Sequence, residues 1–426
     1  MSRPQRRRGE APPTAPASLL GGYRVLDLAD EKGSLCARIL ADFGADVIKV
    51  EPPGGAPERR VGPFYHDVPD PEKSLSWFAW NLNKRGITLN LETGDGRDIF
   101  KKLAATSHFL VETLPPGRME SLGLGYGTLR EVNPAIIHCS ITPFGETGPW
   151  RDYRTSDMIA CATGGLMYMC GDPDRPPVRV NADVACCEAG AQAAAAVMIA
   201  HHFRRLTGRG QHIDVSMQEC IAGILYHTQQ QWDIGREIVP RMGKFIKGRP
   251  INAQTVFPCK DGSISWHILV AYQGDWTRRT VEWMEEEGMA SEELRSIEWE
   301  KLDYVTRTPE QLLRWEGEFA RFFLSKTKAE LRAGAAKRNI MLFTCNTMAD
   351  CLKDEQLAAR DFWVPVHHDE LGEVLVYPGA PLKLSEAPWR LYRRAPLIGE
   401  HNREVFCDEL GFSPRELVLM KQHNVI

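Results

Sequence analysis

The segment that follows Gly21 constrains the fold more than any other part of the chain. Residues 23–28 (YRVLDL) form a short apolar run typical of a buried strand. Residues 34–43 then repeat apolar side chains at helical spacing, and Gly44 follows at the position of a helix-terminating glycine. Residues 46–51 (DVIKVE) predict a second strand. Strand, helix and strand within about thirty residues indicate a βαβ unit of a parallel sheet.

The pattern continues over roughly the first two hundred residues. Further helices are expected at 97–105, 158–165 and 186–205, and further strands at 108–112 and 135–141. The sequence therefore predicts an α/β large domain with a Rossmann-like open parallel sheet. Residues 29–33 read ADEKG at the first turn, which lacks the glycine fingerprint of dinucleotide binding, so we do not expect NAD as a cofactor.

The character of the chain changes after about residue 225. Residues 257–267 predict a hairpin with Asp261–Gly262 at its turn, and residues 276–327, dense in Glu, Arg and Trp, predict surface helices. Short strands return after Asn339, with turns at Leu371–Gly372 and Pro378–Gly379. The expected organisation is a disordered tail at 1–20, a large domain at 21–224, a smaller inserted α+β domain at 225–340, and a return to the large domain with a C-terminal tail at 341–426.

Composition excludes several classes of partner. The chain is 43% hydrophobic and 25% charged with a net charge of −4, so no basic field favours nucleic acid or an anionic membrane. The Ala-rich stretch 189–200 is too short to span a bilayer. Eleven cysteines without paired zinc spacing indicate a reducing cytoplasm. We expect no metal site, since His201–His202 fits a surface helix end and His367–His368–Asp369 lacks a third spaced ligand.

Six segments carry a resemblance to a known family. In chain order they are FGADVIKVEPPGG (43–55), NLNKRGITLNL (81–91), VETLPPGRMESLGLGY (111–126), NPAIIHCSITPFGETGP (133–149), TGRGQHIDVSMQE (207–219) and APLIGEHNREVFCDELG (395–411). Their order and spacing are similar to those of the family III CoA-transferases, the CaiB/BaiF and formyl-CoA transferase group. The resemblance covers nearly the whole chain.

The resemblance implies a fold, a reaction and a partner. Family members are interlocked-ring dimers with the active site between two chains, and they move CoA from an acyl-CoA to a carboxylate. No covalently bound cofactor is expected, because coenzyme A and acyl-CoA are substrates. In the family an aspartate attacks the thioester and then holds CoA as an enzyme-bound thioester. That aspartate lies four residues before a helix glycine, here Gly190, and the spacing to Thr207 and to Pro176–Pro177 places Cys186 at its position.

Four other interpretations of the nucleophile position concern Cys186 itself and nearby carboxylates. An acyl-cysteine route through Cys186 is conceivable, although a small buried residue near a helix start explains it more simply. Asp183, one turn earlier, is the fallback carboxylate, ahead of Glu188 and Asp157. Racemases of the same fold need His before the acidic residue where this chain has Ser156–Asp157, which disfavours that activity.

The resemblance also suggests positions that contact CoA. They are Glu31, Lys32, Lys84, Arg85, Leu89, Thr113, Leu114, Arg118 and Arg154. Lys84 and Arg85 are equally explained as surface charges at the edge of the sheet. Positions that match other CoA contacts read Pro52, Glu92, Ser121 and Thr142, so the cofactor site is expected to be partly degraded.

Three functions follow from these residues. The first is a non-catalytic subunit of a heteromeric CoA-transferase, in which a paralogous catalytic subunit supplies the aspartate and the substrates are an acyl-CoA, such as succinyl-CoA, and a small carboxylic acid. This arrangement resembles that of two-gene members of the family. The second is an active homodimer that uses Asp183. The third is a protein that binds CoA esters without transfer chemistry.

Overall fold

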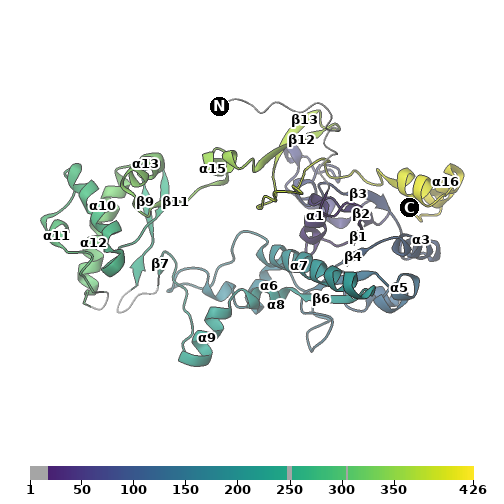
Figure 1. Ribbon diagram of the computed structural model, residues 1–426, viewed down its shortest axis with the longest axis horizontal. Helices are drawn as coiled ribbons and strands as arrows, with labels where there is room; N and C mark the ends of the chain where they lie inside the picture. Colours follow the sequence, from purple (N-terminus) through teal and green to yellow (C-terminus); the bar gives the residue numbers. More distant parts are fainter. Residues whose placement is uncertain (1–17, 247–251, 304–305) are drawn as a thin grey trace, which may run out of the picture. The chain divides into compact units, whose positions relative to one another are not determined.

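The computed structural model describes residues 18–246, 252–303 and 306–426 (Figure 1). Most of the expected tail, residues 1–17, lies outside the described residues. The chain forms two compact units. The large unit comprises residues 1–167, 179–235 and 356–426, and the small unit comprises 168–178 and 236–355. The sequence led us to expect a small domain at 225–340. The small unit instead also includes 168–178 and extends to residue 355, whereas helix α9 (Tyr226–Gly235) groups with the large unit.

A parallel six-stranded sheet organises the large unit and confirms the predicted α/β class. Its order is β3-β2-β1-β4-β5-β6, and each neighbouring pair is parallel. From β1 the chain first adds strands toward β3 on one side of the sheet, and from β4 it adds strands toward β6 on the other side. This change of direction leaves a crevice at the carboxyl ends of β1 and β4. The strands are β1 (Arg24–Leu28), β2 (Asp46–Glu51), β3 (Arg85–Thr88), β4 (Phe109–Glu112), β5 (Ile137–Thr142) and β6 (His212–Ser216).

Helices cover both faces of this sheet. On one face, α1 and α7 share an apolar core with alternate residues of β1, β4 and β5. On the other face, α3, α4 and α5 pack with a C-terminal π-helical turn. The helices of the unit are α1 (Ser34–Asp42), α2 (Leu75–Trp80), α3 (Gly94–Ala105), α4 (Arg118–Ser121), α5 (Tyr126–Val132), α6 (Asp157–Thr163), α7 (Val184–Thr207), α8 (Met217–Gly223) and α9.

Helix α7 is longer than the sequence indicated and lies along the core. It has 24 residues and is long and apolar enough to cross a membrane by length and composition alone, whereas the stretch 189–200 is only its middle part. Half of its most apolar window is buried within the fold. Gly190 allows the close approach to α1, because a Cβ there would lie 2.9 Å from Leu35 Cβ and 3.2 Å from the Cys36 nitrogen. These contacts identify α7 as a core helix of the unit.

The C-terminal segment returns to the large unit and covers the edge of the sheet. Strands β12 (Trp363–His368) and β13 (Glu373–Pro378) form a hairpin whose turn holds Gly372, as predicted. His401 Nδ1 accepts a hydrogen bond from the Gly86 amide at 3.1 Å, and Asn402 Oδ1 accepts one from Thr88 at 2.8 Å. These bonds satisfy donors of the edge strand β3. The π-helix Glu404–Glu409, α15 (Glu355–Ala359) and α16 (Pro414–Gln422), which lies beside α3 in Figure 1, complete the segment.

The small unit has an antiparallel sheet and its own aromatic core. The predicted hairpin is β9 (Val256–Cys259) and β10 (Gly262–Ser265), and β11 (Phe343–Thr344) extends its sheet. Helices expected on the surface instead bury Trp283 and Trp315, because their apolar residues recur on one face. Trp299, which lies in a turn between helices, is buried in the same core. The remaining elements are β7 (Phe245–Ile246), β8 (Ala253–Gln254), α10 (Gly274–Glu286), α11 (Glu292–Ser296), α12 (Pro309–Leu324), α13 (Lys328–Arg338) and α14 (Met348–Cys351).

Candidate active site

The first turn of α7 holds the residues that the sequence singled out. Asp183 is the N-cap residue and is exposed, whereas Cys186, the third helical residue, is buried. The Cys186 amide donates a hydrogen bond of 3.0 Å to Oδ1 of Asp157, the first residue of α6. A carboxylate from a separate helix therefore caps α7 and offsets the partial positive charge of its N-terminus.

Burial and the neighbouring carboxylates make the Cys186 thiol a poor nucleophile. Burial raises the pKa of Cys186 well above its usual value, and the charges of Asp157, Glu31 and Asp183 raise it further. A helix N-terminus ordinarily favours a thiolate, but here three carboxylates act in the opposite direction. The thiol is thus protonated at neutral pH.

The loop after β1 brings two more predicted residues to the same place. The Asp30 amide donates to Oγ1 of Thr113 at 2.9 Å, which joins the carboxyl ends of β1 and β4 at the point where the winding reverses. Glu31 and Lys32 follow directly and line a cavity together with Cys186. Crevices at this point are the usual ligand sites of open α/β sheets.

The cavity that contains Cys186 has a volume of about 680 Å³, enough for a small organic ligand. We refer to it as the Cys186 cavity. Its walls come from the loop after β1, from β2 and the turn that follows, from α2, and from the beginnings of α6 and α7. Its lining residues include Asp30, Glu31, Lys32, Lys49, Glu58, Val61, Trp77, Trp80, Asn81, Asp157, Met158, Arg179, Asp183 and Cys186.

One corner of the Cys186 cavity is acidic. Carboxylate oxygens of Asp30, Glu31 and Glu58 all lie within 4.8 Å of one another. Lys32 forms an ion pair with Asp30, and Lys49 donates to the Ala29 carbonyl oxygen. Within the described ranges, neither His201 nor His367 and His368 belongs to a group of this kind.

The other residues that the resemblance predicted to contact CoA do not line the Cys186 cavity. Lys84 is fully buried, and its ammonium group donates to Asp27 Oδ2 at 2.8 Å, to Asn81 Oδ1 at 3.1 Å and to the Ser34 carbonyl oxygen at 3.3 Å. Arg85 forms ion pairs with carboxylates of β2 and the π-helix. Leu89 and Leu114 belong to the core that contains α3, Arg118 pairs with Glu92, and Arg154 is exposed. Neither Lys84 nor Arg85 lines the Cys186 cavity.

Comparison with known proteins decides the family. A family model described as CoA-transferase family III matches residues 20–402. The chain belongs to CoA-transferase family III. Members of this family use CoA thioesters as substrates and need no separate bound cofactor, so coenzyme A enters this chain's chemistry as part of a substrate.

Relatives of this family III chain align over almost its full length. It is 37% identical to the succinyl-CoA:(R)-benzylsuccinate CoA-transferase subunit BbsE of Thauera aromatica, over 93% of this chain and 95% of that protein. It is 31% identical to the succinyl-CoA–L-malate CoA-transferase beta subunit of Chloroflexus aurantiacus, over 96% and 98%. A CaiB/BaiF family protein from Brucella suis has a similar structure, with a TM-score of 0.78, 27% identity, and coverage of 92% of this chain and 99% of that one.

Sequence reasoning missed several residues that line the Cys186 cavity. Trp77 and Trp80 of α2, Lys49 of β2 and Glu58 line the cavity, yet α2 was not predicted. Ser74 is its N-cap, accepting a hydrogen bond from the Trp77 amide, and this serine before SWFAW was the available signal. Ser156 caps α6 as expected, but the role of Asp157 at α7 depends on tertiary packing.

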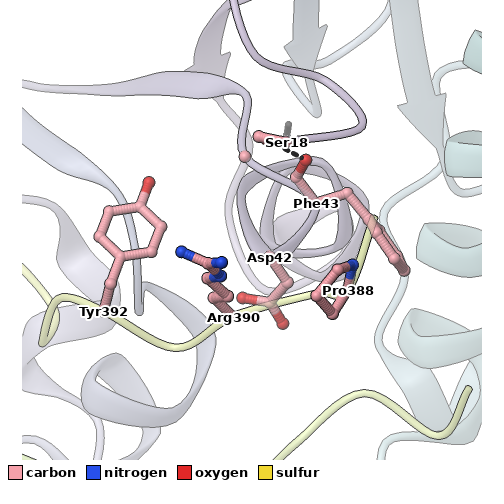
Figure 2. Close-up of a pocket in the computed structure, with 7 residues that line it drawn as sticks. Ser18, Asp42, Phe43, Pro388, Arg390 and Tyr392 are labelled. Atoms are coloured by element: carbon pink, nitrogen blue, oxygen red, sulfur yellow. Dashed lines mark hydrogen bonds between the residues drawn. The ribbon is translucent and has the colours of Figure 1, made fainter. Parts of the chain in front are cut away.

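Two other features of the large unit lie away from the Cys186 cavity. A smaller cavity of about 250 Å³ lies at the end of α1, where Ser18 Oγ donates to the Phe43 carbonyl oxygen at 2.8 Å (Figure 2). It shares no lining residue with the Cys186 cavity. His201, expected at a surface helix end, is instead buried against Tyr23, and its Nδ1 lies 2.7 Å from the guanidinium of Arg204.

Proposed function

We propose that this chain is the non-catalytic subunit of a heteromeric family III CoA-transferase that moves CoA from succinyl-CoA to a carboxylic acid. A paralogous subunit supplies the aspartate nucleophile in this proposal. The observation that carries it is the start of α7, where a protonated, buried Cys186 occupies the position that the family resemblance assigns to the aspartate.

The chemistry explains why cysteine cannot replace that aspartate. A carboxylate that attacks an acyl-CoA releases the CoA thiolate and forms a mixed anhydride. The thiolate then attacks the enzyme carbonyl, releases the acyl carboxylate and leaves an enzyme–CoA thioester. A Cys186 thiolate would gain the acyl group and release CoA, but it offers no carbonyl carbon to which CoA can bond. The transfer cycle stops there.

Other carboxylates near Cys186 are less suited to the role. Asp183 is exposed at the N-cap, one turn from the family position. Asp157 already accepts from the Cys186 amide and from the Cys161 thiol, whose sulfur lies 3.8 Å away. Glu188 accepts a hydrogen bond from Gln192 and does not line the cavity. The homodimer that uses Asp183 therefore remains the second candidate.

The printed names of relatives support a heteromer. One is a subunit of a benzylsuccinate CoA-transferase, and two others are the alpha and beta subunits of a malate CoA-transferase. In an interlocked assembly, a partner would also cover apolar side chains that the large unit exposes, such as Ile199 and Leu206 of α7 and Ile234 of α9. Obligate interfaces of this kind bury more than about 2,000 Å².

We also assign the chain to the cytoplasm. The structure joins none of the cysteines that it describes by a disulfide, which fits a reducing compartment. The apolar helix α7 is accounted for by its packing against α1 and β5.

Intact mass spectrometry of the purified chain, after incubation with succinyl-CoA, tests the proposal. We expect no CoA-sized adduct on this chain, and an adduct on a co-purified paralogue. An adduct on this chain that disappears in Asp183→Ala would instead establish the homodimer. Binding of acyl-CoA with no adduct on any chain and no paralogue would favour the binding protein without transfer chemistry.

A further inference from the structure

Large apolar side chains form part of the lining of the Cys186 cavity. They are Val61, Trp77, Trp80 and Met158. Trp77 is held in place, because its Nε1 donates to the Pro396 carbonyl oxygen at 3.1 Å and the Arg59 guanidinium lies 3.8 Å from its ring centroid. A rigid aromatic wall binds flat or apolar groups at little cost in conformational entropy.

Carboxylates outnumber cations in the lining of the cavity, where five acidic side chains (Asp30, Glu31, Glu58, Asp157 and Asp183) stand against Lys32, Lys49 and Arg179. Glu31, Glu58, Asp157 and Asp183 line the cavity, and none forms an ion pair with any residue that the structure describes. Glu58 is half-buried. Its Oε2 is buried without a hydrogen-bond partner among the described residues, and burial raises the pKa of Glu58.

The three cations of the cavity are already engaged or peripheral. Lys32 pairs with Asp30. Lys49 is buried, donates to a carbonyl oxygen and lies 3.6 Å from Asp27 Oδ1. Arg179 is exposed and donates to the neighbouring Val180 carbonyl oxygen. An additional carboxylate inside the cavity would therefore face like charge on several sides.

We propose that the Cys186 cavity selects CoA thioesters with an uncharged, apolar acyl group, aromatic ones included, and rejects acyl groups that end in a carboxylate. The inference rests on the proposed function and adds to it that this cavity receives an acyl-CoA. It gives the two halves of the heteromer different preferences. Dicarboxylic thioesters such as succinyl-CoA bind at the catalytic subunit, and apolar acyl thioesters bind here.

Equilibrium binding of three thioesters to the full-length chain tests this selection. Benzoyl-CoA, hexanoyl-CoA and glutaryl-CoA share the CoA moiety, so their affinity ratios report on the acyl group alone. By isothermal titration calorimetry at low salt, benzoyl-CoA and hexanoyl-CoA should each bind at least about tenfold more tightly than glutaryl-CoA. Trp80→Ala should weaken benzoyl-CoA more than glutaryl-CoA.

Variants that remove carboxylate charge inside and outside the cavity test whether this charge causes the selection. The double variant Glu31→Gln with Glu58→Gln should reduce the preference to about threefold or less, whereas Asp98→Asn, which removes an exposed carboxylate of α3 outside the cavity, should not change it. Raising the salt concentration for the unmodified chain requires no variant. It should likewise reduce the ratio of its affinity for benzoyl-CoA to its affinity for glutaryl-CoA.

Two results would overturn the inference, and they are distinguishable. Glutaryl-CoA binding as tightly as benzoyl-CoA would refute the selection and leave the proposed subunit role standing. Failure of all three thioesters to bind would refute both the selection and the role of this cavity as an acyl-CoA site.

Discussion

Replacing Lys84 with methionine separates two roles for a residue that the sequence linked to coenzyme A. In the structure Lys84 is fully buried, and each of its three ammonium protons has an acceptor between 2.8 and 3.3 Å away, one of them on Asp27. Methionine retains the length and the apolar stem but removes the charge. Asp27 is then left buried, with Lys49 at 3.6 Å and the Ala29 amide at 2.9 Å as its remaining partners.

The expected loss of unfolding free energy follows from removing one partner of the buried ion pair between Lys84 and Asp27. Removing one partner leaves an uncompensated charge and typically costs about 3–5 kcal/mol. Lys49 offsets part of this cost, so we expect Lys84→Met to lower the free energy of unfolding by about 3 kcal/mol. The double variant Asp27→Asn with Lys84→Met removes both charges and should recover at least half of the loss.

Guanidinium chloride unfolding, followed by tryptophan fluorescence at pH 7, measures these differences. CoA affinity is measured in parallel on the folded variants. A loss of stability below about 1 kcal/mol, together with CoA binding weakened tenfold or more, would refute the structural role and make Lys84 a ligand contact.

Three further predictions concern other parts of the large unit. Asp157→Asn should speed the alkylation of Cys186 by iodoacetamide at pH 8 by about tenfold, measured by peptide mass spectrometry, because it removes a charge that raises the pKa of the thiol; an unchanged rate would contradict this. Burial, followed by neighbouring carboxylates, raises the pKa of Glu146 to about 6, so the folded state binds more protons than the unfolded state between pH 4.5 and 6 and loses stability as pH rises through this window. Glu146→Gln should therefore stabilise the chain at pH 7.5 by up to about 1 kcal/mol and have no effect at pH 4, and equal effects at both pH values in thermal unfolding would refute the assignment. Gly190→Ala should destabilise by about 1–3 kcal/mol in chemical unfolding despite the better helix propensity of alanine, whereas Gly127→Ala in α5, where a new Cβ meets nothing within 4 Å, should be neutral or stabilising; similar effects of the two would contradict the close packing of α1 and α7.

The sheet and its helices were predictable because their signals are local. Alternating strands and helices over residues 23–216 are marked by apolar periodicity and by glycines such as Gly44, and the structure confirms the parallel sheet that they imply. The start of α3 was placed three residues late, because Thr93 is its N-cap and not part of a preceding loop. The length of α7 was underestimated, since its first residues are held by Asp157 from another helix.

The site was only partly predictable because it depends on contacts between distant segments. The family resemblance brought Cys186, Asp183, Glu31 and Lys32 into consideration, and they do line one cavity. Charge type alone could not tell that Lys84 would be turned into the core, where it pairs with an aspartate 57 positions earlier in the chain.

The central claim is that this chain has no working nucleophile of its own, and isotope exchange tests it most directly. Labelled succinate and succinyl-CoA are incubated with the purified chain, alone and in complex with a paralogous subunit, and label in succinyl-CoA is measured. We predict no exchange by the chain alone, exchange by the complex, and an unchanged rate when the complex carries Cys186→Ala. Exchange by the chain alone that is lost in Asp183→Ala or Asp157→Asn would contradict the account.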